Sequence, residues 1–474
     1  MELFLLLGLP PLMAMISFVA RENRTRKMVL LLTAFIHLIT VASFWCRPHN
    51  VQFSPFLGFD ALSQLILTFI SILFFVVSIY LMGTLKEKGR PNKLFIACLL
   101  CLLAAMTLVT MSRHMGLLWI AIEATTLLSA PLINYHRTPQ SIEATWKYLL
   151  ISSLGIALSL LGTLFLAISA TTTVKTVFLP DILSHAAFLS PAWLKLSIIF
   201  LLVGYGTKMG LAPMHTWKPD TYGEAPSPIG ALMSGAITGC AFLAVFRVAQ
   251  ISFHAHLQEF MSPILILFGI LSLAIAAIFI MGQKDFNRML GYSSIEHMGI
   301  LVLGVGLGGG AIWASLFHMI NNAFAKGLIF LAAGNLYQTF QTKKVENIQG
   351  VIHRLPVTGV FLIFGLFVLT GFPPFGIFYS ELLILKQAIT AQRYVVVFFY
   401  LLFLSIIFFG LSKIILEMAL GKPPEHVHKE IKKESFFMIM PLLILTAVLF
   451  FTGIFVPEGL YQAIDEASML LGGR

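Results

Sequence analysis

Runs of apolar residues long enough to cross a bilayer follow one another along nearly the whole chain. About fourteen such runs can be counted, separated by short polar loops. A helix of roughly 20 apolar residues spans the hydrocarbon core of a membrane. The pattern therefore predicts an all-α polytopic membrane protein in which residues 1–474 form a single transmembrane domain. The runs cover residues 2–20, 27–46, 59–84, 92–111, 113–134, 145–170, 194–217, 225–250, 261–282, 288–309, 312–338, 357–391, 394–418 and 433–457.

The positions of the charges support this topology. Only 11% of the residues are charged, and the formal net charge is +10. The Lys and Arg residues gather in alternate loops, which is the positive-inside bias of membrane proteins and places both termini on the outer face. A nucleic-acid partner is not expected, because the charge follows the loops and forms no continuous surface; the lipid bilayer is the expected partner. The basic loops contain residues 21–27, 86–93, 284–288, 343–354 and 422–433.

The first apolar run has no basic segment before it, and its positive charge follows it in the stretch RENRTRK. A cleaved signal peptide has the opposite arrangement. We therefore expect residues 2–20 to form the first spanning helix.

The chain shows no pattern for a cofactor of its own. Cys98 and Cys101 form a CxxC within an apolar run, but no second pair of ligands accompanies them. Structural zinc and iron–sulfur sites usually need four ligands, so packing cysteines are the expectation. No phosphate-binding loop or haem motif is evident. We expect no catalytic residue, no cofactor and no metal in this chain.

Four ionisable residues fall near the middle of their apolar runs: Glu123, Lys208, Lys326 and Glu381. A charge at membrane depth costs roughly 2.5–3.5 kcal/mol on insertion scales, and such residues usually line an ion or proton path inside the bundle. Structural ion pairs are the alternative interpretation. Two acids and two bases in the runs favour a path for protons.

Three histidines accompany these groups: His215, His297 and His318. Histidine exchanges protons near neutral pH, which suits a relay. His318 lies two helical turns before Lys326, on roughly the same face.

Two further charged residues allow other interpretations. Lys386 lies near the end of its run and is expected to extend its ammonium group to the membrane surface. Glu296, beside His297, could lie near the inner surface, and its role is left open.

Prolines are expected to break two of the runs that carry these charged residues. Pro213 lies in the seventh run, and Pro373 and Pro374 lie in the twelfth. Proline removes a backbone donor and clashes with the preceding turn, so these helices should break. Breaks in corresponding places indicate inverted repeats with a transport site at mid-membrane. The spacing predicts peripheral helices over 1–91, two inverted five-helix repeats over 92–250 and 261–418, and a last helix over 433–457.

Several motifs occur together in an order that resembles a known family. The segments GTKMGLAPMHTWKPDTYGEAPSP, LGYSSIEHMG, FHMINNAFAKGLIFLAAG and TGFPPFGIFYSELLIL are similar to the antiporter-like subunits of respiratory complex I. They are also similar to relatives in multisubunit cation/proton antiporters and membrane-bound hydrogenases. The stretch WIAIEATTLLSAPLINYHRTPQ most resembles the F subunit of hydrogenase-4 and formate hydrogenlyase complexes.

The resemblance implies a fourteen-helix proton-translocating fold with two inverted repeats. By motif match, Glu123, Lys208, Lys326, Glu381 and His297 take the positions of the family's pathway residues. The resemblance also implies other antiporter-like and membrane-arm subunits as partners, in the cytoplasmic (inner) membrane of a prokaryote. Peripheral redox subunits on the cytoplasmic side would carry iron–sulfur clusters and a nickel–iron centre, or flavin.

The chain departs from the family pattern in three places. Many members carry a lysine or histidine in the eighth helix, but the eighth run here has no ionisable group before Arg247. Asn322 stands where some relatives have a histidine. His297, His318, Lys326 or water would then fill the gap. The sequence also ends after its fourteenth run, so we expect no long lateral helix.

These residues suggest a mechanism. Burial disfavours the charged form of Lys208, and a nearby Glu123 favours it. We expect the two to pair in one state; when the pairing weakens, the proton moves toward His297, His318 and Lys326, and Glu381 passes it outward.

The expected function is a proton-translocating membrane subunit of an energy-converting redox complex of the hydrogenase-4/formate hydrogenlyase type, with a quinone-reductase subunit of complex I as a close variant. Two other functions remain open. One is a subunit of a sodium/proton antiporter without redox activity, and the other is a structural membrane subunit that conducts no ions.

Overall fold

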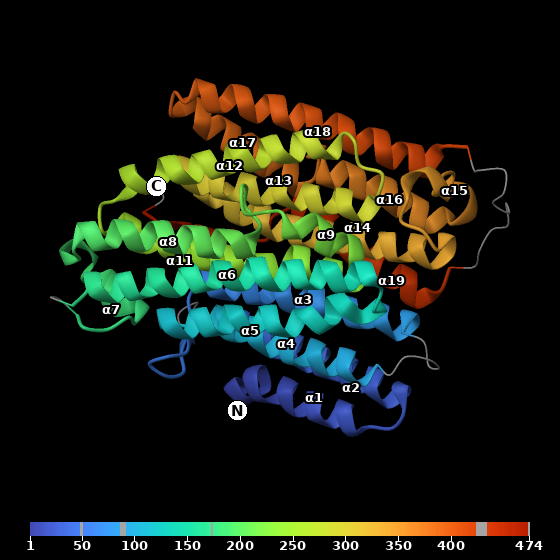
Figure 1. The fold of residues 1–474 in the computed structure, drawn as a ribbon, viewed down its shortest axis with the longest axis horizontal. Coiled ribbons are helices and arrows are strands. Elements are labelled where there is room, and N and C mark those ends of the chain that lie inside the picture. Colours follow the sequence, from blue (N-terminus) through green and yellow to red (C-terminus); the bar gives the residue numbers. More distant parts are fainter. Residues whose placement is uncertain (48–50, 86–91, 172–173, 423–433, 473–474) are drawn as a thin grey trace.

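The computed structural model describes residues 1–47, 51–85, 92–171, 174–422 and 434–472. Its helices lie side by side in one bundle (Figure 1). Among the described residues, twelve helices are long and apolar enough to span a membrane. Two shorter apolar helices, Phe4–Val19 and Pro356–Leu369, complete the fourteen that the sequence predicts. The all-α polytopic fold is therefore confirmed.

The N-terminal part supplies three helices, of which the first two lie at one side of the bundle and the third packs inside it (Figure 1). A short antiparallel pair of strands lies between the second and the third helix. The strands are β1 (Val51–Gln52) and β2 (Gly58–Phe59), with Val51 opposite Phe59. The helices are α1 (Leu9–Val19), which continues from a helical turn over Phe4–Gly8, α2 (Asn23–Ser43) and α3 (Ala61–Thr84).

The middle of the chain supplies the helices around the first broken span. These are α4 (Lys93–Met111), α5 (Met115–Ile133), α6 (Pro139–Ser169), α7 (Leu179–Ser184), α8 (Pro191–Met209), α9 (Trp217–Glu224), α10 (Ser227–Leu232) and α11 (Thr238–His254). A wider helical turn over Met233–Ile237 joins α10 to α11, so the two form one span.

The C-terminal part contains the second broken span. Its helices are α12 (Gln258–Ile280), α13 (Phe286–Leu307), α14 (Gly310–Phe340), α15 (Val351–Arg354), α16 (Pro356–Leu369), α17 (Gly376–Thr390), α18 (Tyr394–Leu420), α19 (Phe436–Ile454) and α20 (Glu458–Met469). The helix α20 follows the fourteenth span and packs against α3 and α14. Sequence reasoning did not anticipate it, because its polar residues place it outside the apolar runs.

Burial separates a central group of helices from the periphery. In the most apolar stretch of each helix, all residues of α14 and of the span formed by α10 and α11 are buried. In α13, 94% of the residues in that stretch are buried. In contrast, α18 is only 22% buried. Ionisable residues on α13 and α14 are therefore surrounded by protein, whereas most of α18 lies at the outside of the bundle.

The two spans that we expect to break at Pro213 and at Pro373 and Pro374 do break, whereas α5, α12 and α19 each continue past an internal proline. The helix α8 ends at Met209, followed by Gly210 in the left-handed conformation with φ +80°, and α9 begins at Trp217. The helix α16 ends at Leu369, and α17 begins at Gly376 after Pro373 and Pro374. The boundaries of the two five-helix repeats stay a prediction.

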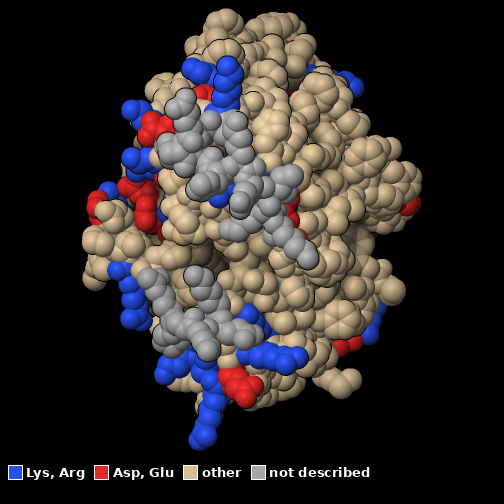
Figure 2. All heavy atoms as spheres, turned by 90° about the vertical axis from the view of Figure 1, so that its right-hand side faces the viewer, with Lys and Arg blue, Asp and Glu red and all other residues tan. Residues whose placement is uncertain are grey.

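Basic side chains gather at one end of the bundle (Figure 2). The chain termini lie toward the left in Figure 1, and the loop that contains α15 lies toward the right. Figure 2 shows this right-hand face, where Lys and Arg side chains gather around its margin. Of the predicted basic loops, residues 86–91 and 423–433 lie outside the described part of the chain.

Candidate functional site

Lys208 lies in the last turn of α8 and is 1% exposed. Its Nζ donates to Thr126 Oγ1 on α5 at 2.8 Å and to the Tyr148 hydroxyl on α6 at 2.7 Å. The hydroxyl of Ser129 donates to backbone carbonyls, so the Tyr148 hydroxyl can donate to Ser129 Oγ at 2.6 Å. Lys208 is therefore held by neutral hydroxyl groups.

Glu123 lies on α5, one turn before Thr126. Its Oε1 accepts a hydrogen bond from Ser153 Oγ on α6 at 2.9 Å. Its Oε2 is buried and has no hydrogen-bond partner among the described residues. In that same part of the chain, no ion pair joins Glu123 to Lys208. In the structure the two residues are therefore unpaired, although Glu123 is near enough to interact electrostatically with Lys208.

Lys218 was missed by sequence reasoning. It lies in the first turn of α9, just after the break, and it is fully buried. Its Nζ donates to the carbonyl oxygens of Met209 at 2.9 Å and Ser294 at 3.4 Å. The predicted break at Pro213 was the one signal in the sequence that could have indicated Lys218. The chain continues from the break to the next buried span inside the protein, so the residues after Pro213 stay buried.

Lys218 stands between the two groups of predicted residues. Its charge acts on His215 and His297, and the charge of Lys326 acts on it. Because α10 and α11 carry no buried lysine or histidine before Arg247, Lys218 fills the central gap that the sequence left open.

Lys326, on α14, is fully buried. Its Nζ donates to Ser293 Oγ on α13 at 2.7 Å, and that hydroxyl donates to Glu296 Oε2 at 3.2 Å. Glu296 is 2% exposed. The residue whose role was left open therefore belongs to the buried cluster, and a serine hydroxyl connects it to the lysine.

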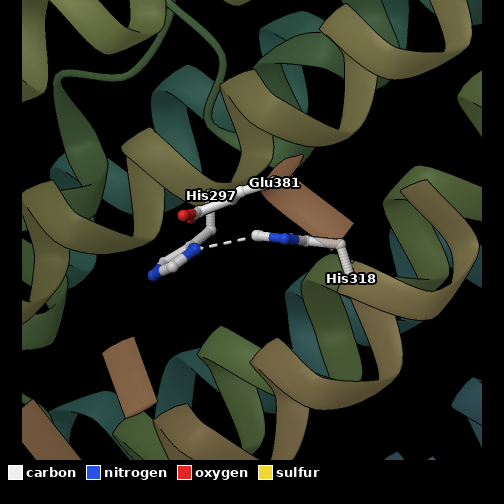
Figure 3. A group of neighbouring side chains, drawn as sticks. All are labelled: His297, His318 and Glu381. Carbon is white, nitrogen blue, oxygen red and sulfur yellow. Dashed lines mark hydrogen bonds between the residues drawn. The ribbon is translucent and has the colours of Figure 1, made fainter. Parts of the chain in front are cut away.

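His297, His318 and Glu381 converge from α13, α14 and α17 (Figure 3). His297 Nδ1 lies 3.0 Å from His318 Nε2, and His318 Nδ1 lies 2.9 Å from Ser380 Oγ. The Ser380 hydroxyl donates its only proton to the Ile377 carbonyl at 2.8 Å.

This hydrogen-bond pattern assigns the histidine tautomers. Ser380 can only accept from His318, so in the neutral pair His318 carries its proton on Nδ1 and presents a lone pair at Nε2. His297 then donates from Nδ1, which leaves its Nε2 as a bare acceptor. That Nε2 is buried without a hydrogen-bond partner in the described chain, and so is Glu381 Oε1.

The remaining predicted residues take less central places. His215 lies in the connection between α8 and α9, and its Nδ1 is buried without a partner among the described residues. Lys386 is exposed, as expected for a residue near the helix end. Arg247 forms an ion pair with Asp60 at 2.6 Å, at the start of α3. Desolvation opposes ionisation of Asp60, but the Arg247 guanidinium outweighs it and holds the pKa of the carboxyl below its usual value.

Together these side chains form two clusters with Lys218 between them, and hydrogen bonds join some of the members within each cluster. The first cluster joins α5, α6 and α8, and the second joins α13, α14 and α17. Lysine, histidine, glutamate and hydroxyl groups can each accept or donate a proton, so the arrangement can move protons through the middle of the bundle.

Comparisons with known proteins identify the family to which the chain belongs. Residues 112–408 match the family described as the transmembrane region of NADH:quinone oxidoreductase and the Mrp antiporter. The chain is 39% identical over 293 residues to a hydrogenase-4 component F homolog of Methylacidiphilum infernorum (isolate V4), covering 60% of this chain and 61% of that protein. The match thus spans less than two thirds of that relative's length.

Two further comparisons extend along more of the chain. It is 27% identical over 368 residues to NADH-quinone oxidoreductase subunit N of Halorhodospira halophila (strain DSM 244 / SL1), covering 76% of this chain and 74% of that protein. In fold it matches a chain of an archaeal membrane-bound sulfane sulfur reductase complex, with a TM-score of 0.89 and 20% identity, over 100% of this chain and 98% of the other. The family match covers more than half of the sequence, and the protein therefore belongs to the NADH:quinone oxidoreductase/Mrp antiporter family of membrane subunits.

Proposed function

We propose that this protein is the proton-translocating membrane subunit of an energy-converting redox complex of the hydrogenase-4/formate hydrogenlyase or complex I type. The observation that carries the proposal is the series of buried lysines on α8, α9 and α14, which are Lys208, Lys218 and Lys326. Isolated buried charges are costly, and a series of them through the centre of a bundle is typical of an ion pathway.

Proton movement would begin at the first cluster. Lys208 is held by Thr126 and Tyr148 in the unpaired state, and a small shift of α5 or α8 would bring it to Glu123. A carboxylate beside the amine favours its charged form. Pairing would therefore load a proton on Lys208, and separation would release it.

Charge repulsion would drive the proton onward. Lys218 and Lys326 act on each other electrostatically, and two like charges in a buried site disfavour each other. A proton that reaches Lys218 therefore promotes the loss of one from Lys326. The bare Nε2 of His297 is a ready acceptor, and His318 and Glu381 continue the path toward the outer face.

The chemistry that powers this movement would belong to partner subunits. Peripheral redox subunits on the cytoplasmic side would carry iron–sulfur clusters with a nickel–iron centre or flavin, and other antiporter-like subunits would lie beside this chain. The protein would reside in the cytoplasmic membrane of a prokaryote with both termini outside, since the basic loops gather at one end of the bundle.

A gradient-driven sodium/proton antiporter subunit is the second candidate, because the matching family includes the Mrp antiporter. The buried residues would serve either role. The two candidates differ in the partner subunits with which the chain would assemble.

The experiment that tests the proposal is isolation of the complex. The chain would be tagged in its native host and purified in mild detergent, followed by assays for nickel, iron and flavin and mass spectrometry of the subunits. We expect iron with nickel or flavin, and iron–sulfur subunits. A complex of membrane subunits without any of these cofactors would contradict the redox assignment and favour the antiporter.

A further inference from the structure

We propose that His297, His318 and Glu381 form a binding site for a zinc-like divalent metal ion that competes with protons for the pathway. Each residue offers one ligand atom, and these atoms all lie within 4.8 Å of one another. The two imidazole nitrogens approach to 3.0 Å. Tetrahedral Zn²⁺ with bonds of roughly 2.0–2.1 Å separates its ligands by about 3.4 Å, so small side-chain shifts suffice.

The donor set selects the class of metal. Two imidazoles and one carboxylate suit zinc and its first-row neighbours, whereas sodium, magnesium and calcium prefer oxygen ligands throughout. Three protein ligands leave a fourth position for water or for the second oxygen of Glu381. The site therefore does not fit an alkali coupling ion.

The supporting shell is already in place. A metal-ligating histidine usually donates its other ring N–H to a fixed acceptor, which orients the ring. His318 does so through Nδ1 to Ser380 Oγ, and the Ser380 hydroxyl is itself anchored on the Ile377 carbonyl. The lone pair of His318 Nε2 is consequently directed toward His297 Nδ1, along the dashed line in Figure 3.

Metal binding requires only local proton rearrangement. The proton on His297 Nδ1 would move to its Nε2, which is buried without a partner among the described residues and can hold it. Nδ1 then gives its lone pair to the metal. Glu381 would bind as a carboxylate, and any proton that it carries would leave to water.

A bound ion and a moving proton would exclude each other, because both need the same nitrogen lone pairs. An ion held by His297 Nδ1 and His318 Nε2, which lie 3.0 Å apart, occupies the atoms through which these histidines would pass a proton. It would therefore remove both histidines from the relay.

The test measures Zn²⁺ binding directly and separately from pumping. Purified complex would be equilibrated with radioactive Zn²⁺ and a competing chelator, and the variants H318Q and E381Q would be compared with the wild type. Each should lose one Zn²⁺ per chain, with affinity lowered about 100-fold or more. S380A, which removes the orienting acceptor, should lower it about 10- to 100-fold.

The control is H185N, which changes an exposed histidine on the connection after α7. It should bind Zn²⁺ like the wild type. Unchanged binding in both H318Q and E381Q would overturn the site. If these variants lose the ion but Zn²⁺ leaves wild-type pumping unaffected, the claim of competition fails, and with it the route through the histidines. A failure of zinc binding alone would leave the proposed pumping function standing.

Discussion

At the scale of single residues, the polar partners of the buried lysines set their chemistry. Lys208 contacts two hydroxyls, Lys218 two backbone carbonyls and Lys326 a serine hydroxyl. These neutral partners accept a hydrogen bond from the lysine but do not hold it in its charged form. A directly bonded carboxylate would hold the lysine charged. Lysines in such places can lose and regain a proton, whereas an arginine could not.

Lys218 provides the first prediction. The substitution Lys218→Leu should reduce proton pumping to background, because it removes the only buried cation between the two clusters in the described chain. Pumping would be measured with a pH-sensitive dye in native-host membrane vesicles. The control Lys386→Leu changes an exposed lysine on α17 and should pump normally. Normal pumping in Lys218→Leu, with normal amounts of complex, would remove Lys218 from the pathway.

The sequence predicted some site residues and missed others for a clear reason. Glu123, Lys208, Lys326 and Glu381 stand out because each interrupts an apolar run. Lys218 lies among polar residues in HTWKPDTY and looks like part of a loop. Only the folded chain shows that this stretch is a buried short helix.

At the scale of elements, α9 is the link between the two halves of the site. Its Asp220 forms ion pairs with Lys147 of α6 and Arg288 of α13, both at 2.9 Å. These partly exposed pairs contribute only modestly to stability, about 0–1 kcal/mol each. They nevertheless connect α9 to helices of both clusters, so a movement of α9 would displace α6 and α13 as well.

Gly210 provides the prediction for this element. It has φ +80°, and an added Cβ would lie 2.6 Å from Lys218 Cδ. Gly210→Ala should destabilise the protein by about 1–2 kcal/mol through the left-handed backbone alone, and it should also slow pumping by displacing Lys218. The thermal unfolding midpoint and the pumping rate would be measured together.

The matched control is Gly282→Ala, at a glycine whose added Cβ would meet nothing within 4 Å. It should change neither quantity. An unfolding midpoint and a pumping rate equal to the wild type in Gly210→Ala would show that α9 tolerates a shift at this break.

The helices themselves were largely predictable. Continuous apolar runs and their proline interruptions depend on local sequence, so the spans and both breaks agree with the structure. The short helix α20 was not predictable in this way. It packs against α3 and α14 and buries Ala463, Ile464 and Ala467. This tertiary contact cannot be read from the length of an apolar run.

At the scale of the whole molecule, the account requires one end of the bundle to face the cytoplasm. The basic loops gather at the end shown in Figure 2, and the chain termini lie toward the other end. The orientation decides which cluster receives protons from the cytoplasm. It follows from the loop charges and is independent of the pathway residues.

Single cysteines test this orientation. In a chain whose four native cysteines are replaced by alanine, Ser184→Cys at the end of α7 should react with a membrane-impermeant maleimide in cells whose cytoplasmic membrane is intact. Gln341→Cys after α14 should react only once that membrane is opened. Both positions are exposed in the structure. The reverse labelling pattern would invert the proposed topology.

The most direct test of the central claim is proton pumping by Lys208→Met in native-host vesicles, driven by the electron donor that the isolated complex oxidises. Methionine fills the site without a titratable group, so the account predicts loss of pumping with the complex still assembled. The control Lys195→Met, at an exposed position on the same helix, should pump at the wild-type rate. Normal pumping by an assembled Lys208→Met complex would contradict the account.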